Sequence, residues 1–536
     1  MDTTLRAPRL CPYGGWRLVG FHFCHPHPAR HFFKLNIMLD TSFILILCFV
    51  TILLVHLWKK SPYQLPPGPR GWPLIGNLLE IPKEYEWLYY ATLEQDYGPI
   101  SSLTVLGKTI IVLNTLEACR DVMEKNSAKC SGRPTLPFAG QMVGWDQQLV
   151  MSPYNKHFRL MRKFAHNFLG TKAAAQKYET VQEAEARTFA LNASQDSEHF
   201  EQHLRTSIGA MVLRMSHGYL VRRDTQDPLT LLIEQSAKDF YIITRPGRWL
   251  VDLIPSIKHI PRWVPGAQFK VAAEQYRKRN VEQTDVPYQF VLQSMAEKTA
   301  LPSMVSQALE RGDLSAEEVY ALKHVSSAMY GGALDTIIST VSKFLLMMIL
   351  HPEIQRSIQN ELDSVVGTHR LPNLRDKVNL SYFSAVQKEV TRFHPIGPLG
   401  IPHEASEDFP YRQYTIPKGS IVIGNIWNIA HNPGIYEDPY NFNPDRFLSN
   451  DAALDPEEFV FGFGRRLCPG IEVAQSTIFI VMATCLALFE ITRALDVDGK
   501  PGVVKPEFTA GTVSHPKPFK CSFKLRSVDA LALLRT

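Results

Sequence analysis

An almost unbroken apolar run lies near the start of the chain. Between Thr41 and Trp58, only two threonines, one serine and one histidine interrupt the apolar residues. As a helix this run is about 27 Å long, close to the roughly 30 Å core of a bilayer. Lys59 and Lys60 follow directly, and no small-residue cleavage site follows the run, which disfavours a cleaved signal peptide. The pattern predicts a membrane anchor over residues 38–60, with the downstream chain in the cytosol.

Residues 1–37 fit this anchor badly. They contain five Lys or Arg residues, which would favour a cytosolic N-terminus as well. Pro and His are scattered through them without a clear period. Two interpretations stay open: residues 1–37 are a genuine extension, or they are an artefact of the gene model and translation starts at Met38.

The anchor is followed by a proline-rich stretch over residues 61–73, which we expect to be a stiff hinge because proline fixes φ and removes a backbone donor. From residue 74 to residue 536 there is no internal repeat and no second linker, which indicates one domain. Its pattern is mostly helical, broken by Pro and Gly. Strand-like stretches occur at Ile100–Leu113, with a turn at Gly107–Lys108, and at Ser420–Ile423. The fold class is therefore mainly α, with a small β-rich lobe.

One helix in this domain is unusually long. Ser315 and Glu318 form a capping box, and the apolar pattern continues from Ala316 to about Ile349 before His351-Pro352 ends it. Such a helix is about 50 Å long. Gly331 and Gly332 near its middle predict either a kink or the close approach of another group to the backbone. Asp335 and Thr336 follow them.

Composition narrows the function classes. The chain has 45% hydrophobic and 20% charged residues, which is ordinary for a globular protein, and a formal net charge of +5. This charge is too small to indicate nucleic-acid binding. The eight cysteines include no C-x-x-C pair, so a zinc ribbon and a disulfide scaffold are both disfavoured.

The clearest chemical signal is a loop around one cysteine. Residues 459–470 read FVFGFGRRLCPG, and a strongly apolar helix is predicted from Ile471 to Phe489. The helix N-terminus and Arg466 would both stabilise a thiolate at Cys468. From the residues alone, this thiolate could be a nucleophile, a redox thiol or a metal ligand. The Gly-x-Gly at Gly462–Gly464 lacks a third glycine and an acidic ribose partner, so it does not indicate a dinucleotide loop.

The loop contains F-x-x-G-x-R-x-C-x-G at Phe461, Gly464, Arg466, Cys468 and Gly470. This signature is similar to that of the cytochrome P-450 superfamily of haem-thiolate monooxygenases. An E-x-x-R motif at Glu389–Arg392 and the segment around Arg446 occur in the family's order, and the long central helix and the proline-rich hinge also fit. The resemblance covers nearly everything after Met38, and segments such as residues 246–266 and 514–521 look like those of the microsomal enzymes of fungal secondary metabolism.

The resemblance implies roles for individual residues. Cys468 is implied as the axial ligand of the iron of haem b (iron-protoporphyrin IX) and Phe461 as a shield of the sulfur, while Gly464 and Gly470 are implied to let the backbone approach the porphyrin. The implied partners of the haem propionates are Arg466, Arg162 and His403. The family usually has Trp four residues before Arg162, and this chain has Phe158, which cannot donate an indole N–H bond.

For two further sets of residues, the resemblance implies a role that differs from the one predicted by spacing or pattern alone. Glu389 and Arg392, by spacing alone, would be a surface pair worth about 0–1 kcal/mol; the resemblance implies a buried structural network of these two with Arg446. Asp335 and Thr336, by pattern alone, could be a solvated helix face. The resemblance implies that they deliver protons to bound dioxygen, with Gly332 opening the helix beside them.

The implied function is a single-pass monooxygenase of the endoplasmic reticulum membrane with a cytosolic catalytic domain. It would insert one oxygen atom of O₂ into a hydrophobic small molecule, as a step of secondary-metabolite biosynthesis. Electrons would come from NADPH through a separate flavoprotein reductase. The alternatives are a haem-thiolate isomerase or dehydratase and a non-catalytic haem-binding protein; Asp335 and Thr336 argue against both.

The substrate's identity cannot be read from the sequence, but family analogy suggests where it would bind. The implied contact regions are Leu136–Trp145, the central helix, Pro398–Ile401 and Thr509–Val513, which are apolar with few polar anchors. One residue of the central helix has two interpretations. Leu334 either faces the substrate and narrows its space, or packs in the core against a neighbouring helix.

Overall fold

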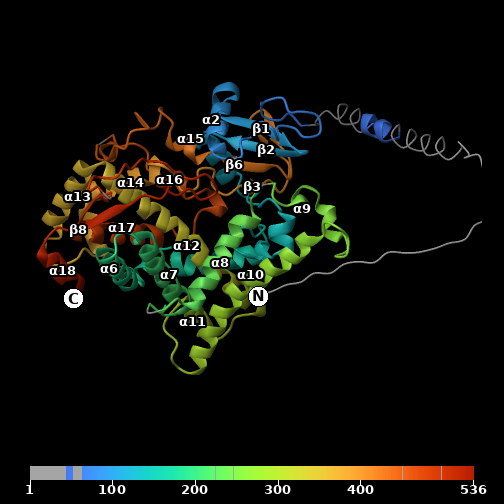
Figure 1. The fold of residues 1–536 in the computed structure, drawn as a ribbon. Helices are drawn as coiled ribbons and strands as arrows, with labels where there is room; N and C mark the ends of the chain where they lie inside the picture. The colour runs from blue at the N-terminus through green and yellow to red at the C-terminus, as the bar shows by residue number, and fades with distance from the viewer. Residues whose placement is uncertain are drawn as a thin grey trace, which may run out of the picture. The chain divides into compact units, whose positions relative to one another are not determined.

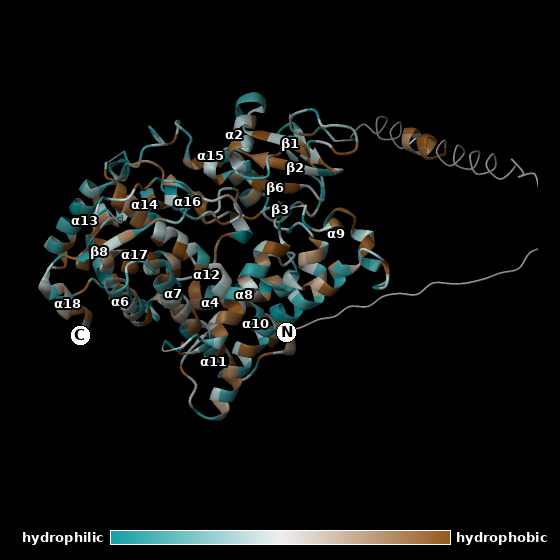
Figure 2. Cartoon of the chain, viewed as in Figure 1, coloured by the Kyte–Doolittle hydropathy of each residue, from teal (hydrophilic) through white to brown (hydrophobic). Residues whose placement is uncertain are grey.

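The computed structural model describes residues 44–51, 63–223, 225–245, 247–449, 451–496 and 498–535. The chain divides into two units, residues 1–60 and residues 61–536, and each is described by itself. In the first unit, residues 44–51 form a helix whose apolar side chains are exposed. The ribbon of this helix has the brown of hydrophobic residues in Figure 2. The rest of the predicted anchor, Lys59 and Lys60, and the whole of residues 1–37 lie outside the described residues.

The predicted hinge, residues 61–73, belongs to the second unit, and its prolines bond to the strand that contains Ser102. The carbonyls of Pro66 and Pro67 accept hydrogen bonds from the Ser102 hydroxyl and backbone N–H, at 2.6 and 2.9 Å. A Cβ on Gly68 would lie 1.8 Å from the Ser102 carbonyl oxygen, so only glycine fits there. Proline lacks a donor but keeps its acceptor, which allows this stretch to attach to an adjacent strand.

The second unit is mainly helical (Figure 1). Its α-helices are α2 (Glu86–Tyr97), α3 (Leu116–Cys119), α4 (Lys156–Leu169), α5 (Lys172–Gln176), α6 (Glu179–Gln195), α7 (Phe200–His217), α8 (Pro228–Ile243), α9 (Leu250–Leu253), α10 (Gln268–Ala296), α11 (Met304–Leu309), α12 (Ala316–Leu350), α13 (Pro352–Val365), α14 (Ser381–Phe393), α15 (Ile426–Ala430), α16 (Glu457–Val460), α17 (Ile471–Leu488) and α18 (Val528–Arg535). Short π-helical and 3₁₀ segments are η1 (Arg120–Lys125), η2 (Pro137–Met142), η3 (Trp145–Gln147), η4 (Pro255–His259), η5 (Leu374–Asn379), η6 (Pro444–Phe447) and η7 (Gly464–Arg466).

The strands form three small sheets. Four strands pair in the order β1-β2-β6-β3, and β4-β5 and β7-β8 are antiparallel pairs. The strands are β1 (Ile100–Val105), β2 (Lys108–Leu113), β3 (His403–Glu404), β4 (Phe409–Tyr411), β5 (Tyr414–Ile416), β6 (Ile421–Gly424), β7 (Phe489–Arg493) and β8 (Cys521–Leu525). The predicted hairpin is therefore confirmed as β1–β2, and the predicted strand Ser420–Ile423 is β6, one residue later. Figure 1 shows the larger sheet next to α2.

The predicted central helix is α12, which runs one residue beyond the expected end. Both bonds of the capping box are formed: the Glu318 N–H donates to the Ser315 hydroxyl, and the Ser315 N–H donates to the Glu318 carboxylate. Near its middle, the helix continues through Gly331 and Gly332 without interruption. Apart from the helix's own backbone, no atom of the described residues lies within 4 Å of a Cβ built on either glycine, so no other described part of the chain approaches the helix there.

Most of α12 is buried among other helices. Its neighbours in the main core include α7, α4 and α17, and Leu334 is part of this core with 1% of its surface exposed. Among the described residues, α12 and α17 are long and apolar enough to cross a membrane, but both lie mostly inside the folded unit. They are therefore core helices by their packing.

A smaller apolar cluster is separate from the main core. It joins η2, the end of α8, α9 and α10 through Phe138, Val143, Ile243, Val251 and Ala273. The Phe138 and Trp249 rings stack with centroids 3.7 Å apart. This η2–α10 cluster contains the region 136–145 that the sequence suggests for substrate contact.

Candidate active site

The cysteine loop joins α16 to α17 and is held by its own backbone. The Cys468 N–H donates to the Phe461 carbonyl at 2.9 Å, and the Leu467 N–H donates to the Gly464 carbonyl at 3.2 Å. Gly470 is the N-cap residue of α17, so the thiol lies two residues before a helix N-terminus. Burial raises the pKa of the Cys468 thiol, whereas the Gly470 backbone N–H and the Arg162 charge act in the opposite direction. The site therefore supplies two groups that favour the thiolate.

The two glycines of the signature have different surroundings. Apart from its chain neighbours, no atom of the described residues lies within 4 Å of a Cβ built on Gly470, so there is free space beside it. A Cβ on Gly464 would lie 2.6 Å from the Met123 carbonyl oxygen, and its φ of +54° favours glycine. Glycine at position 464 thus allows the loop to lie against η1, which is a structural reason for this residue within the protein itself.

Two arginines, Arg466 and Arg162, lie close enough at the loop for their charges to repel each other. Arg466 donates to the carbonyls of Ser131 at 2.9 Å and Ser152 at 2.7 Å, while its buried Nη1 has no hydrogen-bond partner among the described residues. Arg162 on α4 donates to the Leu467 carbonyl at 2.7 Å. Burial, followed by repulsion from Arg162, lowers the pKa of Arg466 to about 9. An anion at this position would relieve both effects.

Phe158 contacts this cluster in a way that the sequence does not reveal. The Arg466 guanidinium carbon lies 3.8 Å from the centroid of the Phe158 ring. Phe158 cannot replace an indole N–H donor, but its π face stabilises the cation above it. The aromatic residue therefore positions Arg466 by stacking.

His403 lies near the same cluster, beside an arginine that sequence reasoning missed. The His403 Nδ1 donates to the Cys130 carbonyl at 2.7 Å, and burial, then the charge of Arg133, lowers the pKa of His403 to about 3. Arg133 donates to the carbonyls of Val150, Ile401 and Pro402. Arg133 lies in the loop Ser131-Gly132-Arg133-Pro134, which has no periodic pattern or motif. The local sequence therefore does not mark it as a site residue.

These basic groups fit a haem with two carboxylates. Every hydrogen bond that Arg133, Arg162 and Arg466 make within the described residues goes to a main-chain carbonyl, so their charges have no acidic partner there. Buried cations require compensation, and one Arg466 nitrogen is free to provide a hydrogen bond. The cysteine, the free space beside Gly470 and the unpaired basic cluster match a thiolate-ligated group that bears propionates.

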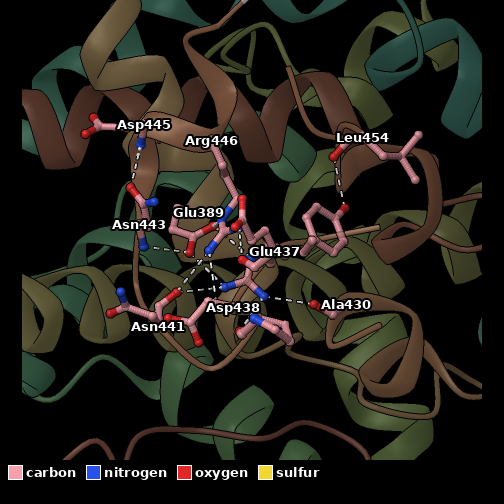
Figure 3. A network of polar contacts seen from close by, with 12 residues as sticks. Glu389, Ala430, Glu437, Asp438, Asn441, Asn443, Asp445, Arg446 and Leu454 are labelled. Atoms are coloured by element: carbon pink, nitrogen blue, oxygen red, sulfur yellow. Dashed lines mark hydrogen bonds and ion pairs between the residues drawn. The ribbon is translucent and has the colours of Figure 1, made fainter. Parts of the chain in front are cut away.

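Glu389, Arg392 and Arg446 form a buried network, shown in Figure 3. Arg392 donates to both Glu389 oxygens at 2.7 and 2.8 Å, and Arg446 Nε lies 3.3 Å from Glu389 Oε2. Arg392 also donates to the carbonyls of Ala430 and Pro439, and Arg446 donates to that of Glu437. The network thus joins α14 to the segment that precedes the cysteine loop. It consists of structural contacts, and the surface-pair interpretation does not hold because the Glu389 and Arg392 side chains are fully buried.

Asp335 and Thr336 lie on the part of α12 with the open glycines. The Thr336 hydroxyl donates to the Gly332 carbonyl at 2.8 Å, and Gly332 itself is exposed. Asp335 is 8% exposed, and its carboxylate is held from two other helices. Arg205 on α7 donates to Oδ1 at 3.2 Å, and the Tyr241 hydroxyl on α8 donates to Oδ2 at 2.7 Å. Burial and the Asp335 charge raise the pKa of the Tyr241 phenol.

Sequence reasoning also missed Arg205 and Tyr241. They precede Asp335 by 130 and 94 residues, and neither belongs to a recognisable motif. No local signal could have identified them, because their role follows from the packing of α7 and α8 against α12.

Comparison with known proteins agrees with this geometry. The cytochrome P-450 family model matches residues 66–523. The cytochrome P-450 monooxygenase claR of Ampulloclitocybe clavipes is 46% identical over 489 residues, covering 91% of each chain. Cytochrome P-450 monooxygenase 208 of Postia placenta is 38% identical, covering 94% of this chain and 98% of its own. The cytochrome P-450 monooxygenase ppsD of Aspergillus oryzae is 37% identical, covering 91% of this chain and 95% of its own.

The thiolate loop, the buried Glu–Arg–Arg network and the long central helix define a haem-thiolate oxidoreductase. The chain belongs to the cytochrome P-450 family and is a monooxygenase of that family.

Proposed function

We propose that this protein is a membrane-anchored monooxygenase that inserts one oxygen atom of O₂ into a hydrophobic small molecule, as a step of secondary-metabolite biosynthesis. The observation that carries this proposal is the Cys468 loop together with the unpaired cluster of Arg162, Arg466 and Arg133. Relatives named as cytochrome P-450 monooxygenases support the reaction class. The apolar surroundings of region 136–145 support a lipophilic substrate.

Cys468 would hold haem b by its thiolate, and Arg162, Arg466 and His403 would lie toward the propionates. When bound, the haem supplies the activation of dioxygen. The Phe461 carbonyl fixes the backbone N–H of Cys468, and Gly470 leaves room beside the loop. Arg466 is held by two carbonyls and the Phe158 ring through its other atoms, so its remaining Nη1 can donate to an anion without losing these contacts.

Asp335 and Thr336 would supply protons. The Thr336 hydroxyl donates a hydrogen bond to the Gly332 carbonyl, so its oxygen can still accept a hydrogen bond from another donor and pass a proton on. Asp335 is ordered by Arg205 and Tyr241, whose side chains are both partly exposed and so connect the buried carboxylate with water. General acid groups act best when they are ordered in this way.

The membrane and the reductase belong to the same proposal. Residues 38–60 would anchor the protein in the endoplasmic reticulum membrane, with the catalytic domain in the cytosol. The helix at 44–51 with its exposed apolar side chains supports this anchor. Electrons would come from NADPH through a separate flavoprotein reductase, because the chain has no flavin or nicotinamide fingerprint of its own.

The Cys468→Ala variant tests the proposal. We expect it to lose the carbon-monoxide difference band that marks a thiolate-ligated haem, because no other thiolate lies in this loop. Cys485→Ala, in the buried interior of α17, is the matched control and should keep the band. Retention of the band by Cys468→Ala would contradict the proposed ligand. A wild-type protein that binds haem but transforms lipophilic compounds without NADPH would indicate an isomerase or dehydratase instead.

A further inference from the structure

Ser514 uses all of its polar groups to join three separate segments of the chain. Its N–H donates to the Ile396 carbonyl at 2.8 Å, and its carbonyl accepts from the Ser339 hydroxyl at 2.7 Å. Its own hydroxyl donates to the Thr509 carbonyl at 2.6 Å and lies 2.7 Å from His394 Nε2. Because the only hydroxyl proton goes to Thr509, His394 Nε2 is the donor to Ser514. The residue is 1% exposed, so water does not compete for these bonds.

His394 is itself fixed on several sides. Its ring stacks on Phe508 with centroids 3.9 Å apart and an angle of 8°, and its carbonyl accepts a hydrogen bond from the buried Lys343 amine. The Phe508 carbonyl accepts from the Tyr85 hydroxyl at 3.0 Å. The imidazole therefore has one orientation, which aims Nε2 at Ser514.

The segment held by Ser514 is a closed turn. The Thr509 N–H donates to the His515 carbonyl at 2.8 Å, and the His515 N–H donates to the Thr509 hydroxyl at 3.0 Å. At the tip, Gly511 has φ of +125°, and Gly511 and Thr512 are both exposed. The base of the turn is thus fixed through Ser514, while the tip is free to contact another molecule.

This turn lies beside the part of α12 that holds the acid and the hydroxyl. Ser339 and Lys343 follow Thr336 by three and seven residues, so all three share one face of the helix. Burial lowers the pKa of His515, which follows Ser514, while the charge of Asp335 raises it and that of Arg205 lowers it. The turn is therefore fixed, through the bond between Ser339 and Ser514, to the same helix face that bears Thr336.

We propose that Ser514, with its partners His394 and Ser339, is a positioning residue that fixes the turn 509–513 next to the open face of α12 and thereby determines which part of a hydrophobic substrate faces the reacting centre. This inference rests on the proposed function, since it requires a haem-bound substrate space beside Thr336. Ser514 would act through the turn and would not touch the substrate. Its loss should change selectivity between ligands of different shape more than it changes binding of a very small ligand.

The experiment compares azole probes that bind the haem of the full-length, haem-loaded protein. Imidazole, N-phenylimidazole and clotrimazole are titrated by difference spectroscopy into the wild type, Ser514→Ala and His394→Phe. His394→Phe keeps a ring to stack on Phe508 but removes the bond to Ser514. Ser326→Ala is the control, because Ser326 is a buried serine of α12 whose hydroxyl, among the described residues, bonds to the Lys323 carbonyl of its own helix.

We expect the affinity ratio of N-phenylimidazole to clotrimazole to change about fivefold or more in Ser514→Ala and in His394→Phe, with imidazole affinity and Ser326→Ala unchanged. The double variant should show no larger change than either single variant, because both remove the same bond. Unaltered ratios in both single variants, or fully additive changes in the double variant, would overturn the inference.

Folding is monitored by the carbon-monoxide band. If Ser514→Ala loses this band, Ser339→Ala carries the same test, because it removes only the bond to the Ser514 carbonyl. An unaltered probe ratio in Ser339→Ala would then overturn the inference. Absence of the band from the wild type would contradict the proposed function instead, so the two failures are distinguishable.

Discussion

At the scale of single residues, Arg466 of the cysteine loop is held firmly by part of its guanidinium and keeps one nitrogen for another partner. Two carbonyls and the Phe158 ring hold the guanidinium, and one nitrogen has no partner among the described residues. A buried cation in this state costs free energy unless an anion compensates it. Arg466 therefore favours an anion at this position, such as a haem propionate.

Leu334 gives a prediction about stability. Its side chain is 1% exposed and belongs to the main core, so it packs against neighbouring helices and does not line the open face of α12. We expect Leu334→Ala to lower the free energy of unfolding by about 2–5 kcal/mol, because it leaves a cavity in the core. Thermal or denaturant unfolding measures this change.

The products of Leu334→Ala should be the same as those of the wild type. Val378→Ala, at a residue that is 85% exposed, is the control and should change neither stability nor products. Unchanged stability of Leu334→Ala together with a new product pattern would show that Leu334 faces the substrate.

Lys343 gives a prediction about pH. This lysine is 1% exposed, and its amine donates to the His394 carbonyl. Burial, then the charge of Arg392, lowers its pKa to about 7, well below the value of about 10.4 for an unfolded chain. Between these two values the unfolded state binds more protons than the folded state. Stability should therefore rise with pH over this window, by at most about 1.4 kcal/mol per pH unit from this group.

The Lys343→Met variant removes this contribution. We expect its unfolding free energy to rise less between about pH 7 and pH 10 than that of the wild type. Lys238→Met, at an exposed position of α8, should leave the wild-type profile unchanged. Parallel profiles for the wild type and Lys343→Met, measured by denaturant unfolding, would show that Lys343 keeps an ordinary pKa.

At the scale of secondary-structure elements, α8 connects the η2–α10 cluster with the central helix. Ile243 at its end belongs to that cluster, and Tyr241 donates to Asp335 on α12. Arg205 approaches the same carboxylate from α7, which packs extensively on α12. Asp335 is therefore held by α7 of the main core and by α8, which contributes residues to both clusters.

The Tyr241→Phe variant tests whether this connection matters for proton delivery. Loss of the donor leaves Asp335 with Arg205 alone, so the carboxylate should be less ordered. We expect the share of NADPH electrons that end in hydrogen peroxide to rise about threefold or more, because proton delivery is then less efficient. The measurement is peroxide formed per NADPH consumed.

The chain offers a matched control at the other end of α8. The Tyr219 hydroxyl donates to Asp227 at 2.8 Å, so Tyr219→Phe removes the same type of bond away from α12. Equal peroxide ratios in Tyr219→Phe and Tyr241→Phe would show that the effect is a general loosening of α8.

At the scale of the whole molecule, the proposed orientation can be tested in microsomes. Lys59 and Lys60 after the apolar run favour a cytosolic catalytic domain. The chain contains two Asn-x-Ser sequons for N-glycosylation, at Asn192 and Asn379. We expect protease added to intact microsomes to digest this domain, and both sequons to carry no glycan. A protected domain, or glycan on either asparagine, would place it in the lumen.

The sequence alone predicted those parts of the protein that depend on neighbouring residues. The bounds of α12 follow from Ser315, Glu318 and Pro352, because capping and proline geometry act over a few residues. The β1–β2 hairpin follows in the same way from its turn. The cysteine loop was recognisable because its residues are contiguous in the chain.

Only the tertiary structure decided which distant residues meet. Arg205 and Tyr241 join Asp335, Arg133 approaches His403, and Ser514 binds His394 across 120 residues. The structure likewise shows that the Glu389–Arg392 pair is buried and is not an ordinary surface pair, and that Leu334 lies in the core. The physical reason is that hydrogen bonds and packing between separate elements depend on how the helices assemble, and this assembly leaves no periodic or local pattern at the residues that make the contacts.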